Sequence, residues 1–248
     1  MPTLATAPLA IVAAMHQELR ALLALLDAPR RITLGGREFH LGSIHGAPVV
    51  LALSGIGKVA AATTAVLMLQ TFEAERLVFT GVAGGLGDGV EVGDIVVASE
   101  LLQHDMDASP LFPRFEIPLT GRSRFGTDAT MAQALAAAAQ GLPAARVHRG
   151  LIISGDAFIG SAAQGVTLRA LLPDALAVEM EGAAVAQVCA DFGRPFGVVR
   201  TISDRADDAA HGDFARFIDE IASVTTRALI EAWLRAEAHS TDAATPLR

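Results

Sequence analysis

The chain alternates between short, nearly continuous apolar runs and stretches in which apolar residues return with helical spacing. Apolar runs of this kind predict strands buried on both faces, and the periodic stretches predict the helices that cover them. The expected strands are residues 9–14, 37–44, 48–53, 76–80, 94–99, 146–154, 176–178 and 196–200. The expected helices are residues 17–26, 58–72, 128–139, 164–171, 182–192 and about 213–238.

This order of elements predicts an α/β fold with three layers, α/β/α, in which helices lie on both faces of one sheet. No internal repeat and no long linker divides the chain, so one domain over residues 1–238 is expected. The small, polar residues 239–248 are predicted to be a disordered tail.

Residues 100–127 break the pattern, because they hold three prolines and little periodicity. Loops of this length inside a compact domain often serve as lids or partner contacts. Phe112 and Phe115 lie in this segment. Two interpretations stay open: these rings cover an apolar ligand, or they pack against a second subunit.

Composition narrows the class of protein further. Of the 248 residues, 52% are hydrophobic and 19% are charged, the net charge is -8, and Lys and Arg form no cluster. Nucleic-acid and anionic-membrane binding therefore have no electrostatic support, and a neutral or weakly charged small molecule is a better ligand than a polyanion. With one cysteine, no membrane-length apolar run and no basic residue before Arg20, we expect a soluble cytoplasmic protein.

Two segments each bring carboxylates out of apolar surroundings. Residues 178–182 (Val-Glu-Met-Glu-Gly) carry Glu179 and Glu181, and residues 200–204 (Arg-Thr-Ile-Ser-Asp) carry Asp204. Each segment alone is explained as a helix cap or a rim. Together with Glu18, they favour a polar site cut into the core.

Glycine-rich turns follow three of the predicted strands. Residues 54–60 formally match the dinucleotide-binding fingerprint, yet no acid follows at the distance a ribose needs, so we interpret them as a tight turn near a small ligand. Residues 80–87 form a second glycine-rich loop at a strand end, where α/β sheets bind ligands. After the strand that ends near Ser154, Phe158 is placed either to stack on a planar ring or to join the core.

Other chemistries find little support. The histidines never reach metal-ligand spacing, and no Gly-x-Ser-x-Gly elbow is present, so neither a metal site nor a serine nucleophile is expected. Cys189 lies among apolar residues and is predicted to be part of the core. The polar segment 104–107 (His-Asp-Met-Asp) fits an interface or a site without indicating which.

Taken together, these motifs resemble the 5′-methylthioadenosine/S-adenosylhomocysteine nucleosidases, within the purine nucleoside phosphorylase and nucleosidase superfamily. The resemblance extends from residue 10 to about residue 234, and it rests on Ala14-Met15 with Glu18 and on the segments 54–58, 83–85, 92–94, 154–156, 178–181 and 202–204. It implies a twisted mixed sheet flanked by helices, a nucleoside substrate, and no metal or organic cofactor. It also implies a homodimer in which a loop of the neighbouring subunit completes the site.

The resemblance assigns a role to each matching residue. Asp204 would protonate adenine N7 with support from Ser203, and Glu18 would activate the attacking water, close to Arg200. Glu181 would hold the ribose hydroxyls, and Met180 would pack against the sugar. Phe158 would stack on adenine, while the Ile159 backbone would read its edge. The remaining expected substrate-binding residues are Ile56, Ala83, Gly84 and Glu179.

Val82 departs from the family pattern, which has a serine at this position in the nucleophile pocket. A valine cannot donate a hydrogen bond, so water positioning or substrate choice is expected to differ, and phosphate binding there is disfavoured. The resemblance predicts a hydrolase that releases adenine from 5′-methylthioadenosine or S-adenosylhomocysteine. The alternatives are a phosphate-dependent nucleoside phosphorylase, a nucleoside-binding protein without catalysis and, more distantly, a nicotinamide oxidoreductase.

Overall fold

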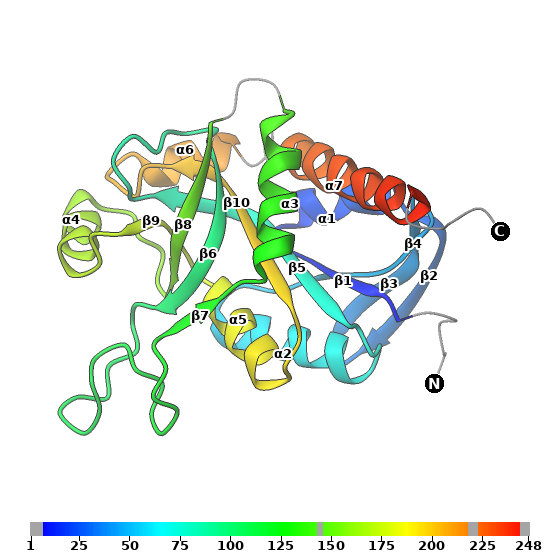
Figure 1. Ribbon diagram of the computed structural model, residues 1–248. Coiled ribbons are helices and arrows are strands. Elements are labelled where there is room, and N and C mark those ends of the chain that lie inside the picture. Colours follow the sequence, from blue (N-terminus) through cyan, green and yellow to red (C-terminus); the bar gives the residue numbers. More distant parts are fainter. Residues whose placement is uncertain (1–6, 143–145, 218–222, 244–248) are drawn as a thin grey trace.

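The fold is that of a computed structural model, which describes residues 7–142, 146–217 and 223–243 (Figure 1). Its strands are β1 (Leu9–Ala13), β2 (Asp27–Leu34), β3 (Arg37–Ile44), β4 (Ala47–Leu53), β5 (Arg76–Gly85), β6 (Ile95–Gln103), β7 (Arg124–Gly126), β8 (Val147–Ser154), β9 (Ala175–Glu179) and β10 (Phe196–Asp204). Its helices are α1 (His16–Leu23), α2 (Lys58–Gln70), α3 (Ala129–Gln140), α4 (Ala162–Leu171), α5 (Gly182–Asp191), α6 (Ala210–Phe217) and α7 (Ser223–Ala243).

All of these strands belong to one mixed sheet in the order β10-β6-β8-β9-β5-β1-β4-β3-β2, with β7 paired to β6. Strand β1 lies parallel to both β4 and β5, whereas β5 pairs antiparallel with β9. Strand β10 pairs with β5 as well as with β6. The sheet therefore curls, and strands β5, β10, β6, β8 and β9 close into a ring.

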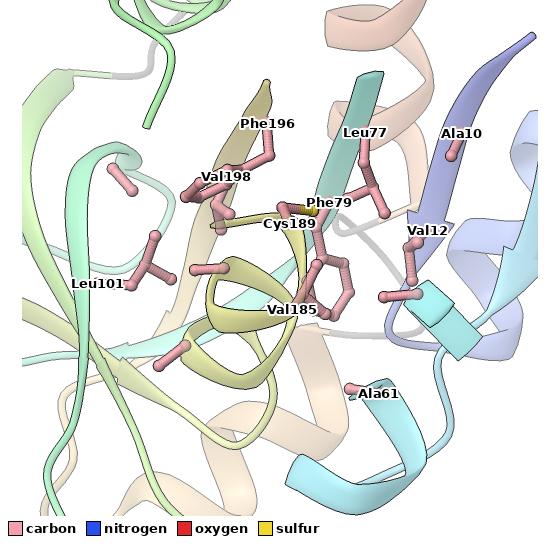
Figure 2. Packing of buried hydrophobic residues seen from close by; sticks show 14 of the residues in the cluster. Ala10, Val12, Ala61, Leu77, Phe79, Leu101, Val185, Cys189, Phe196 and Val198 are labelled. Atoms are coloured by element: carbon pink, nitrogen blue, oxygen red, sulfur yellow. The ribbon is translucent and has the colours of Figure 1, made fainter. Parts of the chain in front are cut away.

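Helices cover both faces of the sheet, as the alternating pattern predicted. Helices α1, α3 and α7 pack on one face, and α2 and α5 pack together on the other (Figure 1). Figure 2 shows the second layer, in which Cys189 of α5 lies among Phe79, Phe196 and Val198 of the strands. Cys189 is fully buried, and burial raises the pKa of its thiol to about 12, which confirms the prediction of an inert core residue.

Several elements differ from those expected. Strand β2 was not predicted, because it is a polar and mostly exposed edge strand that contains Pro29. Strands β5, β6 and β10 continue past their expected ends, so the expected loop at residues 80–87 is strand as far as Gly85. The irregular stretch 100–127 contains the end of β6 and all of β7.

The expected closing helix at 213–238 is two helices, α6 and α7, which pack on different elements. Helix α7 continues to Ala243, and His239 Nδ1 lies 2.6 Å from the Arg235 carbonyl within it. Residues 239–243 of the predicted disordered tail are therefore helical, and residues 244–248 lie outside the described residues.

Candidate active site

A pocket of about 370 Å³ opens where the carboxyl ends of the parallel strands β1, β5 and β10 meet. Its volume lies in the range typical of small-molecule sites, and most of its lining is apolar. The residues that line it are Ala14, Met15, Ile56, Val82, Ala83, Gly84, Phe158, Val178, Glu179, Met180, Glu181, Ser203, Asp204 and Phe214. Three carboxylates and one hydroxyl are thus concentrated in apolar surroundings.

Asp204 is the last residue of β10 and is 2% exposed. Its Oδ2 accepts a hydrogen bond from the Ser203 hydroxyl at 2.8 Å, and its Oδ1 accepts one from the Ala206 amide at 2.9 Å. Burial raises the pKa of Asp204, although these two donors oppose the rise. A carboxyl group in this state can hold a proton for transfer to a ligand.

The backbone of β5 comes unusually close to Asp204. A Cβ atom on Gly84 would lie 2.9 Å from Asp204 Oδ1, so only glycine leaves room for this carboxylate. Gly84 of β5 pairs with Val178 of β9 and with Asp204 of β10, so β5 lies between the two strands that carry Glu179 and Asp204. The glycine-rich sequence therefore provides close approach within a strand rather than a loop.

Glu181 caps the start of α5 and faces the pocket. The Gly57 amide donates to its Oε1 at 2.8 Å. Burial and the neighbouring Glu179 carboxylate raise the pKa of Glu181 to about 7, while the Gly57 amide and the positive charge of Arg200 oppose the rise. Glu181 is therefore poised between its two charge states near neutral pH.

Glu179 has a different environment only two residues earlier. Its carboxylate accepts hydrogen bonds from the Ser154 hydroxyl and from the amides of Glu181 and Gly182. Its Oε2 also lies 2.6 Å from Arg200 Nη2 in a fully buried ion pair. These bonds engage both carboxylate oxygens, so the geometry favours Glu179 as a positioning residue rather than a direct ligand of the substrate.

Arg200 lies behind the pocket lining and is fully buried. Besides Glu179, it donates to the carbonyls of Phe79 and Val199 at 3.3 Å, and its guanidinium lies 4.0 Å from the Phe79 ring centre. Gly81 makes room for it, since a Cβ there would lie 3.2 Å from Arg200 Nη1. Arg200 thus links strands β5, β9 and β10 behind the pocket.

Glu18 is also fully buried and lies behind the wall formed by Ala14 and Met15. The Met15 amide donates to its Oε2 at 3.0 Å, and the Thr226 hydroxyl of α7 donates to its Oε1 at 3.1 Å. Burial raises the pKa of Glu18, although Met15, Arg200 and Thr226 oppose the rise. It is the third acid in this region whose protonated form burial favours.

Two connecting segments, the turn after β4 and the loop after β8, supply the outer rim. Ile56 comes from the first and Phe158 from the second, and these side chains are 69% and 43% exposed. The Phe158 ring meets the Phe214 ring of α6 edge to face, with ring centres 5.9 Å apart. An aromatic wall of this kind suits a planar heterocycle.

The structure brings most of the predicted site residues to this pocket. Ile159 lines a smaller cavity that adjoins it, while Glu18 and Arg200 lie just outside the lining. Phe112 and Phe115 do not line the pocket.

Sequence reasoning missed Phe214, because a phenylalanine in a helical stretch is usually a core residue and carries no signal of its own. Among the described residues, no group of His, Cys, Asp and Glu is arranged to hold a metal ion.

Residues 8–235 match the sequence profile of the Phosphorylase superfamily. This match spans the whole sheet and every residue of the pocket. The chain therefore belongs to that superfamily.

Solved structures narrow the assignment. The chain is 34% identical to the 5′-methylthioadenosine/S-adenosylhomocysteine nucleosidase of Neisseria meningitidis in complex with methylthio-immucillin-A, with a TM-score of 0.89 over 93% of this chain and 100% of that one. A mutant Helicobacter pylori nucleosidase with 5′-methylthioadenosine in its active site is 33% identical, with a TM-score of 0.87 over 93% and 99%. A futalosine hydrolase mutant of Helicobacter pylori is 33% identical, with a TM-score of 0.86 over 93% and 100%. Within the superfamily, this chain belongs to the 5′-methylthioadenosine/S-adenosylhomocysteine nucleosidases.

Proposed function

We propose that the protein is an N-ribosyl hydrolase that cleaves 5′-methylthioadenosine, S-adenosylhomocysteine or both into adenine and the thio-ribose product. The observation that carries this proposal is the state of Asp204, a carboxyl group with a raised pKa at the wall of an apolar pocket. Adenine is a poor leaving group until a proton is added to it. Burial favours the protonated form of Asp204, which is the form that can supply that proton.

Asp204 is therefore the general acid, directed at adenine N7. The Ser203 hydroxyl bonds to Asp204 Oδ2 and also lies 3.3 Å from the Ala83 carbonyl, so it fixes the orientation of the carboxyl group. Phe158, with Phe214 behind it, gives the adenine ring a surface to stack on. The Ile159 backbone lies beside this surface, where it can read the edge of the base.

The sugar is expected to lie against Met180 and Glu181. A carboxylate there accepts hydrogen bonds from the ribose hydroxyls and stabilises the positive charge that develops as the glycosidic bond breaks. Glu181 accepts from the Gly57 amide, whereas the Glu179 carboxylate is engaged by the Ser154 hydroxyl, two backbone amides and Arg200. Glu181 is thus better placed than Glu179 to bind a ligand.

Glu18 is proposed to activate the attacking water from the face opposite the base, as the second carboxylate does in inverting glycosidases. It is buried beside the pocket, and the Thr226 hydroxyl and the Met15 amide fix its two oxygens. Burial raises the pKa of Glu18, and the positive charge of Arg200 opposes this rise by favouring the ionised form that a base requires. Val82 lines the pocket in this region, and its side chain can neither donate nor accept a hydrogen bond.

The pocket favours water over phosphate as the nucleophile. None of its described lining residues is a lysine, arginine or histidine, whereas three are carboxylates. A phosphate dianion would therefore enter the pocket without a free counter-charge, since Arg200 is already paired with Glu179. This observation separates the hydrolase from the phosphorylase alternative.

A homodimer, a cytoplasmic location and a role in methionine salvage are part of the same proposal. Ile56 lines the pocket yet is 69% exposed, and Val59 of α2 and Leu111 of the long loop are 78% and 84% exposed. Large exposed apolar side chains support a subunit interface that also closes the pocket. Sedimentation of the purified protein tests the dimer, and a monomer at all concentrations would contradict it.

The activity is tested by following adenine release from 5′-methylthioadenosine and S-adenosylhomocysteine, in phosphate-free buffer and then with phosphate added. The proposal predicts release without phosphate and free thio-ribose as the second product. Strict phosphate dependence would make the protein a phosphorylase. Tight binding of a nucleoside without turnover in either buffer would make it a binding protein, with Val82 as the first residue to change.

A further inference from the structure

Three charged residues outside the pocket form a compact cluster at the ends of β6, β8 and the turn before α2. Lys58 Nζ lies 2.6 Å from Asp105 Oδ1, and Asp105 Oδ2 accepts a hydrogen bond from the Asp156 amide at 2.9 Å. Asp156 Oδ1 in turn accepts from the Lys58 amide at 2.7 Å. We call these residues, Lys58, Asp105 and Asp156, the clamp.

The clamp holds the start of helix α2 together with the pocket. Gly57 is the N-cap residue of α2 and, as a glycine, has no side chain that could accept a hydrogen bond from the first amides of the helix. Two consecutive amides at this end instead find carboxylates from other elements: Gly57 donates to Glu181, and Lys58 donates to Asp156. Because the first amides of a helix carry a partial positive charge, both carboxylates are stabilised there. The position of one amide fixes that of the other.

The backbone around the clamp leaves little freedom. Gly57 has φ of +90°, and a Cβ there would lie 3.0 Å from Asp156 Oδ1. Gly155 is similarly constrained, since a Cβ on it would lie 2.4 Å from Nε2 of the buried His104. Lys58 Nζ also donates to Gln103 Oε1 at 3.0 Å, which ties the lysine to the end of β6. The turn before α2 is thus anchored to two strand ends.

We propose that Asp105 and Asp156 are positioning residues that, through Lys58 and the Gly57 amide, hold Glu181 in the orientation that binds the ribose hydroxyls. This inference rests on the proposed function of Glu181. It adds to the site two residues that touch neither the pocket nor the substrate.

The electrostatic setting of Glu181 makes a single amide important. The charged groups that face Glu181 are the Glu179 carboxylate, which disfavours its ionised form, and the Arg200 guanidinium, which favours it. The Gly57 amide, which donates to Oε1 at 2.8 Å, also favours the ionised form, as does the Met180 amide. If the clamp releases α2, Glu181 loses this bond while the repulsion from Glu179 remains.

The test measures kcat and KM of the full-length protein with 5′-methylthioadenosine and with its 2′-deoxy and 3′-deoxy forms. Asp156→Ala is expected to lower kcat/KM about 10-fold for the ribose substrate and less than about 3-fold for at least one deoxy substrate, because the lost interaction is with a hydroxyl. Asp105→Asn should show the same pattern more weakly. The matched control is Glu237→Gln, which removes a half-buried ion pair of the same 2.6 Å length, between Arg76 and Glu237, far from the site.

A double-variant cycle completes the test. If the clamp acts through Glu181, Asp156→Ala should have almost no further effect on kcat/KM in a Glu181→Gln background. Equal losses with all three substrates, or full additivity with Glu181→Gln, would overturn the inference and leave the clamp as a stabilising contact. Failure of the proposed function is distinct, since it appears as absent adenine release in the unmodified protein.

Discussion

Glu179 and Glu181 are two residues apart, yet they belong to different regions of the site. Glu179 forms its floor, with Ser154, two backbone amides and Arg200 around its carboxylate. Glu181 belongs to the pocket wall, as does Asp204, and burial raises the pKa of both. A buried carboxylate surrounded by donors holds the structure together, whereas one with few donors is available for chemistry. The contacts of Glu179 thus favour rigidity, and the proposed function assigns proton transfer and binding to Asp204 and Glu181.

The largest effect on stability is expected from removing Glu179, which forms the floor of the site. Glu179→Ala leaves Arg200 buried without its counter-charge. The loss of the Glu179 carboxylate should lower the free energy of unfolding by about 3–5 kcal/mol. Urea denaturation of the variant measures this loss. Glu237→Gln, in the half-buried pair with Arg76, is the control and should change the free energy of unfolding by about 1 kcal/mol or less. Equal effects would show that the floor is an ordinary ion pair.

Glu18→Gln addresses the proposed base. The amide keeps the shape and an acceptor for the Met15 amide, but it cannot take a proton from water. We expect kcat to fall about 10²- to 10⁴-fold with little change in the unfolding midpoint. Steady-state adenine release together with thermal unfolding separates the two effects. Turnover within a few-fold of the unmodified protein would exclude Glu18 as the base.

The pocket wall is expected to make stability depend on pH. The pKa of Glu181 is about 7 in the folded protein against an ordinary value of 4.5, so the folded state binds this proton more tightly than the unfolded state does. The free energy of unfolding should therefore decrease as the pH rises from about 4.5 to about 7, by roughly 1–3 kcal/mol from this residue. Asp204 and Glu18, whose pKa values are also raised, act in the same direction.

Glu181→Gln removes this contribution, so the free energy of unfolding of the variant should change less across this pH range than that of the unmodified protein. A stability that increases over the same window would contradict the raised pKa values.

The smallest effect is expected at the rim. Phe158 is 43% exposed, so Phe158→Ala should change the unfolding midpoint little. The loss of a stacking surface should lower kcat/KM about 5- to 10-fold, mainly through KM. Kinetics with 5′-methylthioadenosine measure this change. An unchanged KM would mean that Phe214 or another side chain supplies the stacking surface.

The sequence predicted the parts of the molecule that leave a local pattern. The strands β1 and β4 were found because they are apolar and mostly buried, and β3 because it buries Phe39, Leu41 and Ile44, whereas β2 escaped because its residues are mostly polar and exposed. The extension of β5 to Gly85 was not predicted, because a run of glycines is typical of a turn. Here the glycines allow close packing against Asp204, which belongs to β10 and is distant in the sequence.

The site shows the same division. Glu18, Glu181 and Asp204 were identifiable as acids in apolar surroundings, and the motifs gave them roles. The separate environments of Glu179 and Glu181 were not predictable, because the donors come from Gly57, Ser154 and Arg200, which are far away in the chain. The contribution of Asp105 and Asp156 was hidden for the same reason.

The central claim is that Asp204 donates the proton that releases adenine. The most direct measurement is adenine release by Asp204→Asn in phosphate-free buffer, with substrate binding measured in parallel. The asparagine still accepts the Ala206 and Ser203 bonds in part, so the protein should fold and bind the nucleoside while kcat falls by about 10²- to 10⁴-fold. Near-normal turnover by this variant would contradict the account, because the leaving group would then receive its proton from elsewhere.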